Sequence, residues 1–176
     1  MNRYRSAVTL AAYIGAIVAA NWLTNHYGLM PVGFGLTATA GTYCAGMALM
    51  LRNLVQDAVG RKGVVAAIVA GAALSALTSP ALAVASGVAF GVSELADTAA
   101  YTPLRRHGWA RAVIPASLLG ALLDTLLFLS IAGFPVTTPG VMGQLVGKTW
   151  AVWLPVLLVT AYRGARRAVP GDTVRA

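Results

Sequence analysis

Long apolar runs, joined by connections of alternating charge, restrict the fold of this sequence more than any other feature. Within the 176 residues, these runs cover 7–23, 36–51, 64–77, 81–101, 112–132 and 141–162. A helix that spans a bilayer needs about 20 apolar residues, so helices with short loops would use nearly the whole chain. The runs are continuous and do not alternate apolar with polar residues, which excludes a transmembrane β-barrel.

The connections between the runs fall into a basic class and a neutral class. The basic connections are the N-terminus, 52–62, 105–111 and the C-terminal tail. The neutral connections, which contain no Lys or Arg, are 24–35, 78–80 and 133–140. Lys and Arg keep short loops on the cytoplasmic side of a membrane, so this alternation predicts an all-α, polytopic membrane protein with about six transmembrane helices and both termini in the cytoplasm.

Composition favours a single transmembrane domain, residues 1–176, with no separate soluble part. Only 10% of the residues are charged and 58% are hydrophobic, whereas a soluble domain needs more charge to cover its surface. The net charge of +8 would suggest a nucleic-acid partner in a soluble protein. Here the basic residues lie mainly between apolar runs, so we expect contact with the lipid of a bacterial inner membrane and none with nucleic acid.

The first apolar run has a second interpretation as a cleaved signal peptide. Arg3 and Arg5 precede it, and Val18-Ala19-Ala20 has the small residues of a cleavage site. The run is long for a signal peptide, and the sequence after it is also apolar. We therefore expect it to be the first spanning helix.

Charged and amide side chains inside the predicted spans are the main candidates for function. Glu94 and Asp97 are three residues apart and share one helix face. Asp124 lies about midway along the fifth run, and Gln144 precedes Lys148 by one turn in the sixth. An ionised carboxylate near the bilayer centre costs roughly 2.5–3.5 kcal/mol on insertion scales. These side chains are therefore expected to face the interior of the helix bundle, where water, a cation or a bound molecule can compensate them.

Two interpretations of these groups are open. Lys148 can form a buried ion pair with Asp124. A single lysine within the spans leaves two acids uncompensated, so for Glu94 and Asp97 a polar cargo site or a proton relay is favoured.

The sequence contains no P-loop, GxSxG or HExxH motif, and the lone Cys44 provides no metal-binding spacing. We therefore expect neither an enzyme nor a bound cofactor.

Two segments with GxxxG spacing, Gly87–Gly91 and Gly143–Gly147, predict close packing between helices. Glycines four residues apart leave a flat helix face that another backbone can approach. This packing can lie within one chain or between two chains. Because the bundle is small, we expect a homodimer.

Several motifs, taken together and in order, resemble the queuosine precursor transporters, also called the VUT family. The resemblance runs from about residue 20 to residue 150. The matching segments are 20–24, 31–43, 51–57 with Gly60-Arg61, 86–90 with 93–97, 101–105, Gly120 with Asp124, and 143–148. The chain departs from the family pattern at Asn53, where an acid is expected, and at Ala116-Ser117, where Ser-Asn is common; both departures bear on cargo preference.

The resemblance implies a transporter that carries 7-deazaguanines, namely 7-cyano-7-deazaguanine or its aminomethyl relative, into the cell. A carboxylate can accept hydrogen bonds from the ring N–H and the exocyclic amine of such a base at once. The carboxylate candidates are Glu94, Asp97 and Asp124. The aromatic candidates for stacking on the base are Phe34, Tyr43, Phe90 and Trp150. The candidates for the remaining polar edges are Asn21, Gln144 and Lys148.

Two other functions are compatible with the sequence. One is the substrate-binding subunit of a multi-subunit vitamin or nucleobase transporter, which works with an ATPase partner. The other is a membrane scaffold that uses its GxxxG faces and transports nothing. Neutral variants of Glu94 and Asp97 distinguish a transporter, which is expected to lose uptake, from a scaffold, which is expected to keep its role.

Overall fold

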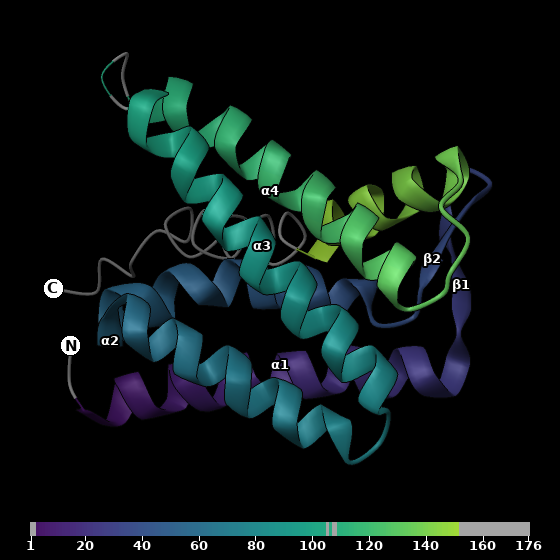
Figure 1. The fold of residues 1–176 in the computed structure, drawn as a ribbon, viewed down its shortest axis with the longest axis horizontal. Coiled ribbons are helices and arrows are strands. Elements are labelled where there is room, and N and C mark those ends of the chain that lie inside the picture. Colours follow the sequence, from purple (N-terminus) through teal and green to yellow (C-terminus); the bar gives the residue numbers. More distant parts are fainter. Residues whose placement is uncertain (1–2, 105, 107–108, 152–176) are drawn as a thin grey trace, which may run out of the picture.

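The computed structural model of the protein describes residues 3–104, 106 and 109–151. Its elements are α1 (Arg3–Tyr27), β1 (Leu29–Gly33), β2 (Leu36–Thr39), α2 (Thr42–Ala76), α3 (Pro80–Leu104) and α4 (Trp109–Ile131). Residues 138–151 form a further helix. Helix α1 packs mainly against α2, and α3 packs mainly against α4, with the small two-stranded sheet at one end of the bundle (Figure 1).

The helical membrane fold expected from the sequence is present. By length and composition, Arg3–Tyr27, Leu54–Ala76 and Pro80–Leu104 can each cross a membrane, and the shorter helix Leu118–Ile131 is also apolar. The number of spans and the cytoplasmic position of both termini stay predictions. The end of the sixth apolar run and the basic tail lie outside the described residues.

The predicted start of the second span is wrong, because residues 29–39 form an antiparallel β-hairpin. The chain turns at Phe34 and Gly35, whose φ angles are 54° and 71°. Two successive positive φ angles are required by a type I′ turn, which fits the natural twist of a two-stranded hairpin. Helix α2 therefore begins only at Thr42.

The charged segment 52–62 is helical, which corrects its prediction as a loop. Helix α2 runs through it, and only Gly60, with φ 75° and ψ 176°, departs from helical geometry. Leu, Arg, Gln and Ala in this segment all favour helix, and the segment contains no proline. Gly60 divides α2 into the parts 42–59 and 61–76, and the bend lies at the end of the bundle opposite the hairpin (Figure 1).

The apolar core lies between α1, α2 and α3. Its largest buried side chains include Tyr13, Ile17, Val55, Val64 and Phe90. The two helices α1 and α2 approach closely at Gly71, where an added Cβ would stand 2.9 Å from Cγ2 of Ile17. A larger residue at this position would therefore push the two helices apart.

The Gly143–Gly147 segment packs tightly within the chain, against strand β2 as well as helix α2, whereas its spacing predicted packing between helices. An added Cβ on Gly143 would lie 2.0 Å from the carbonyl oxygen of Thr37, and one on Gly147 would lie 2.7 Å from Cγ2 of Thr42. The 138–151 helix thus lies directly against β2 and the start of α2. Gly91, in the other segment, faces no atom of the described residues within 4 Å, and the expected homodimer stays a prediction.

Candidate functional site

A small, largely enclosed cavity lies where the helices and the hairpin meet. Its polar lining residues are Asn21, Thr24, Thr39, Ser86, Asp124, Gln144 and Lys148. Its other lining residues are Ala20, Gly41, Ala45, Phe90 and Phe128. The centre of a water molecule has about 20 Å³ in which to move, which is room for roughly one ordered water.

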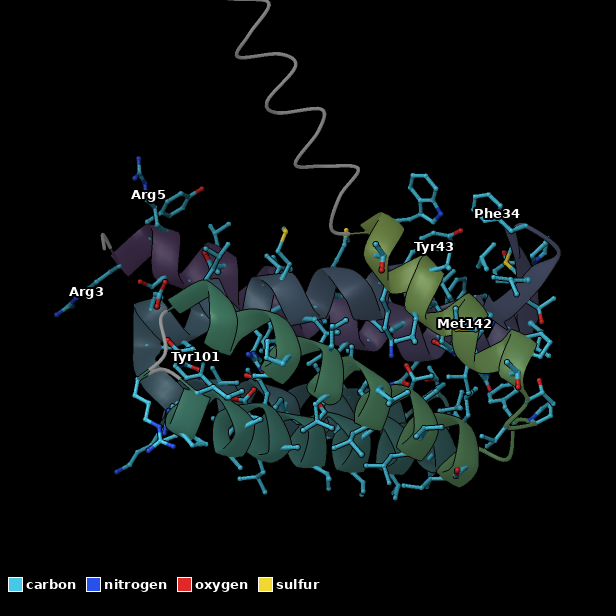
Figure 2. All side chains as sticks on the ribbon, turned by 90° about the horizontal axis from the view of Figure 1, so that it is seen from above. Arg3, Arg5, Phe34, Tyr43, Tyr101 and Met142 are labelled. Atoms are coloured by element: carbon cyan, nitrogen blue, oxygen red, sulfur yellow. The ribbon has the colours of Figure 1, made fainter. Side chains whose placement is uncertain are left out.

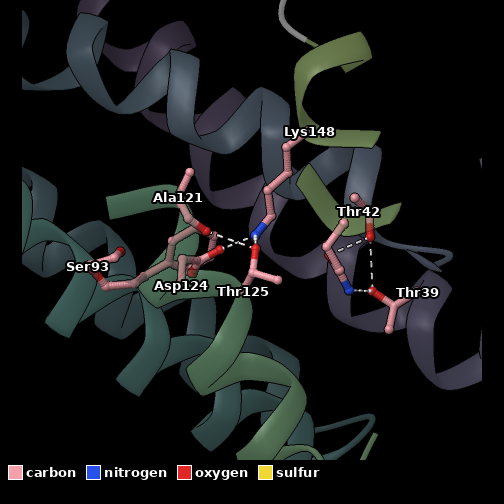
Figure 3. Close-up of polar contacts among 9 residues, drawn as sticks. Thr39, Thr42, Ser93, Ala121, Asp124, Thr125 and Lys148 are labelled. Carbon is pink, nitrogen blue, oxygen red and sulfur yellow. Dashed lines mark hydrogen bonds and ion pairs between the residues drawn. The ribbon is translucent and has the colours of Figure 1, made fainter. Parts of the chain in front are cut away.

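Lys148 and Asp124 form a buried ion pair in the cavity lining. Nζ of Lys148 lies 2.5 Å from Oδ2 of Asp124 and 2.8 Å from Oγ1 of Thr125 (Figure 3). The two charged side chains are only 6% and 4% exposed. The hydroxyl of Thr125 in turn donates to the carbonyl oxygen of Ala121, one turn earlier in α4. The ion pair that the sequence left open is therefore present.

Gln144, one turn before Lys148, is held by two buried threonine hydroxyls. Its Nε2 donates to Oγ1 of Thr39 at 2.8 Å, and Oγ1 of Thr42 donates to its Oε1 at 2.7 Å. The two hydroxyl oxygens are 3.1 Å apart, and these contacts are drawn in Figure 3. Thr39 ends β2 and Thr42 begins α2, so the turn from strand to helix brings both hydroxyls to the same amide.

Asn21 joins three helices at the cavity. Its Nδ2 donates to Oγ of Ser75 in α2 at 3.0 Å, and its Oδ1 accepts from Oγ of Ser86 in α3 at 2.6 Å. The side chain of Asn21 is buried. The structure thus places Asn21 in the polar lining of the cavity, and its contact with a cargo stays a prediction.

Glu94 and Asp97 are compensated by Arg52, which corrects the expectation that they lack a counter-charge. A guanidinium nitrogen of Arg52 donates to Glu94, and another lies 3.6 Å from Oδ2 of Asp97. Arg52 was predicted to lie in a loop, but the helical continuation of α2 brings it into the bundle, where its side chain is 17% exposed. Among the described residues, the lining of the cavity includes Asp124 but neither Glu94 nor Asp97.

Phe34 and Tyr43 lie outside the cavity, which corrects their assignment as stacking partners there. Phe34 is 83% exposed at the turn of the hairpin and Tyr43 is 41% exposed. Together with Trp150 they border an open surface groove. Figure 2 shows Phe34 and Tyr43 on the outside of the molecule, at the same end. Phe90, also a candidate from the sequence, does line the cavity.

Several residues in and around the site were not singled out from the sequence, namely Thr24, Thr39, Thr42 and Ser86, although all four lie in segments that carry the family resemblance. Hydroxyl side chains in apolar helices can bond to their own backbone, so their presence does not by itself indicate a site. Phe128 had a usable signal, because it lies four residues after Asp124 and therefore on the same helix face. Arg52 was missed because its charge was taken as a sign of a loop.

Residues 76–162 match the family model described as "Putative vitamin uptake transporter". The match covers α3, α4 and the 138–151 helix, which supply Asp124, Gln144, Lys148 and both phenylalanines to the cavity. It supports a place for this chain in a vitamin uptake transporter family and a role in transport across a membrane. No curated protein and no solved structure matches the chain.

Proposed function

We propose that this protein is a bacterial inner-membrane transporter that imports a queuosine precursor, 7-cyano-7-deazaguanine or a related 7-deazaguanine. The family match supports uptake across a membrane in general. The observation that carries the proposal is the buried carboxylate of Asp124, which is paired with Lys148 in a cavity that Gln144 and Asn21 also line. A bundle without cargo gains little from buried charges, because well-packed apolar residues are often as stabilising.

The polar lining suits a planar base with hydrogen-bonding edges. The ring N–H and the exocyclic amine of a 7-deazaguanine lie side by side, so the carboxylate of Asp124 can accept from both in a charge-assisted pair. The ammonium of Lys148 has three protons to donate, and its contacts with Asp124 and Thr125 leave one for the ring carbonyl of the base. Asn21 and Gln144 each carry further donor and acceptor capacity for the remaining edges.

Loading of such a base requires the helices around the cavity to separate. With room for roughly one water, the cavity has the dimensions of a closed state. Phe90 of α3 and Phe128 of α4 lie in its lining and supply aromatic faces that can stack on a planar ring once it opens. Rocking of the α1/α2 pair against the α3/α4 pair would expose the cavity to each side of the membrane in turn, the usual principle of alternating access.

Complementation of uptake tests this proposal. The chain is expressed alone in a bacterium that can neither make nor import the precursor, the cells are fed 7-cyano-7-deazaguanine, and queuosine in tRNA is measured by mass spectrometry. The wild-type chain should restore queuosine, whereas Asp124→Asn should not, although it reaches the membrane. Ser130→Ala, an exposed position on the same helix, is the matched control and should behave like the wild type.

Two results would contradict this function. If queuosine returns only when an ATPase partner is supplied, the chain is a binding subunit and not a complete transporter. If no 7-deazaguanine is taken up under either condition, and the purified chain does not bind one, the proposed cargo is wrong.

A further inference from the structure

Thr39, Thr42 and Gln144 form a closed ring of three hydrogen bonds whose direction, for this orientation of the Gln144 amide, follows from counting protons. All three side chains are buried, and a threonine hydroxyl has a single proton to donate. Thr42 donates that proton to Oε1 of Gln144, so in its 3.1 Å contact with Thr39 the donor must be Thr39. Nε2 of Gln144 then donates to Thr39 and closes the ring.

We infer that Thr42, together with Thr39, is a positioning residue that holds the amide of Gln144 ready for the cargo. The inference rests on the proposed function. The ring uses one of the two N–H groups of Gln144 and one of the two lone pairs of its carbonyl oxygen. The second N–H and the second lone pair are left for a molecule in the cavity that Gln144 lines. Thr42 is not part of that lining as the described residues form it, so its effect on the cargo must pass through Gln144.

The ring can also run in the opposite direction. If the amide turns by 180°, Nε2 donates to Thr42, Thr42 donates to Thr39 and Thr39 donates to Oε1, and every group makes the same number of hydrogen bonds. The ring therefore fixes the place of the amide and leaves its polarity free. Gln144 can offer either a donor or an acceptor at the same point, so it tolerates both an acceptor and a donor on the cargo edge that it meets.

The variants Thr42→Val and Thr42→Ser separate the hydroxyl from the shape of the side chain. Valine keeps a methyl group against Gly147, where Thr42 packs, but has no hydroxyl, whereas serine keeps the hydroxyl and lacks the methyl. Thr42→Val removes two of the three hydrogen bonds of the ring. In cells fed 7-cyano-7-deazaguanine, it should raise the KM for uptake about tenfold at a nearly unchanged maximal rate, as expected when the displaced amide of Gln144 loses one hydrogen bond to the cargo. Thr42→Ser should stay within about twofold of the wild-type KM, because the ring is intact.

A structural role alone would give a different pattern. It would lower the amount of protein in the membrane without a change in KM, and serine would be affected at least as much as valine. An unchanged KM in Thr42→Val, or an equal rise in Thr42→Ser, therefore overturns the inference. If the wild-type chain takes up no 7-deazaguanine, the proposed function fails and the inference fails with it. If the wild-type chain takes up the base and Thr42→Val does so with the same KM, only the positioning role of Thr42 is refuted.

Gln144→Glu tests the reversible polarity of the ring. A carboxylate has only acceptors, so both threonines donate to it and no donor is left for the cargo. Competition by 7-cyano-7-deazaguanine, whose nitrile accepts hydrogen bonds, should weaken about tenfold or more relative to competition by its aminomethyl relative, whose amine donates them. Both competitors keep the ring N–H, the exocyclic amine and the ring carbonyl assigned above to Asp124 and Lys148. An equal effect on both competitors would refute the inference that Gln144 can present either a donor or an acceptor to the cargo.

Discussion

Removal of one partner of the Asp124–Lys148 pair should destabilise the protein far more than removal of both. The two side chains are 4% and 6% exposed and their charged atoms are 2.5 Å apart, so either one alone would be an uncompensated buried charge. Breaking a buried ion pair in this way costs about 3–5 kcal/mol. Replacing both partners by neutral groups of similar shape is often roughly neutral. The double variant Asp124→Asn with Lys148→Met should therefore recover most of the stability lost in each single variant.

Thermal unfolding of the protein purified in a mild detergent measures these differences. For a chain of this length, about 2–4 °C of Tm corresponds to each kcal/mol, so each single variant should lower Tm by roughly 6–20 °C. The double variant should lie close to the wild type. In the complementation assay described above, the double variant should nevertheless show no uptake, because the carboxylate proposed to bind the base is gone.

Each half of this prediction can fail independently. Equal stability of the single and double variants would refute the reasoning that the two charges are buried and depend on each other. Normal uptake by the double variant would show that the pair is structural only, and would remove Asp124 from the proposed cargo site.

Three further predictions concern packing, the second charged cluster and orientation. Gly143→Ala should prevent accumulation of folded protein in the membrane, because its Cβ would lie 2.0 Å from the carbonyl oxygen of Thr37. The control variant Gly91→Ala has no atom of the described residues within 4 Å of the added Cβ, so it should accumulate normally on immunoblots. Equal accumulation of the two alanine variants would contradict the close approach of Gly143 to Thr37. Glu94→Gln and Asp97→Asn should each insert normally, since Arg52 keeps one acid partner, but should lose uptake; full uptake by both would exclude these acids from transport. In a Cys44→Ser background, an impermeant maleimide should label Phe34→Cys in intact cells and Lys62→Cys only after permeabilisation, since both positions are exposed; the reverse result would invert the predicted orientation.

The helical membrane fold was predictable from the sequence because it depends on local properties. Apolar runs of spanning length and the positions of Lys and Arg can be read without knowing any contact. Lipid also leaves the backbone few choices, because every buried N–H and C=O must be paired within the helix. The same argument identified Asp124 and Lys148 as groups that need a partner in the bundle, since their cost in lipid is large wherever they pack.

The β-hairpin and the position of Arg52 were not predictable in this way. Residues 36–39 are nearly as apolar as the helix that follows, so hydropathy does not separate the strand from the helix. The charge of Arg52 was interpreted as a sign of a loop. Its actual partner, Glu94, is 42 residues away in the chain, so no local sequence pattern could indicate that the two side chains pair inside the bundle. Both errors arose where a tertiary contact, and not local composition, determines the structure.

The sequence by itself therefore determined that this chain is helical, lies in a membrane and contains buried groups that must be paired. Only the tertiary structure decided the partners, because Lys148 meets Asp124 from 24 residues away and Gln144 meets Thr39 from 105 residues away. These partners are set by how closely the helices approach. That approach depends on contacts such as the one at Gly46, where an added Cβ would lie 2.8 Å from Cα of Lys148. Hydrogen bonds form only within a few tenths of an ångström of their preferred lengths, and packing between distant segments supplies that precision.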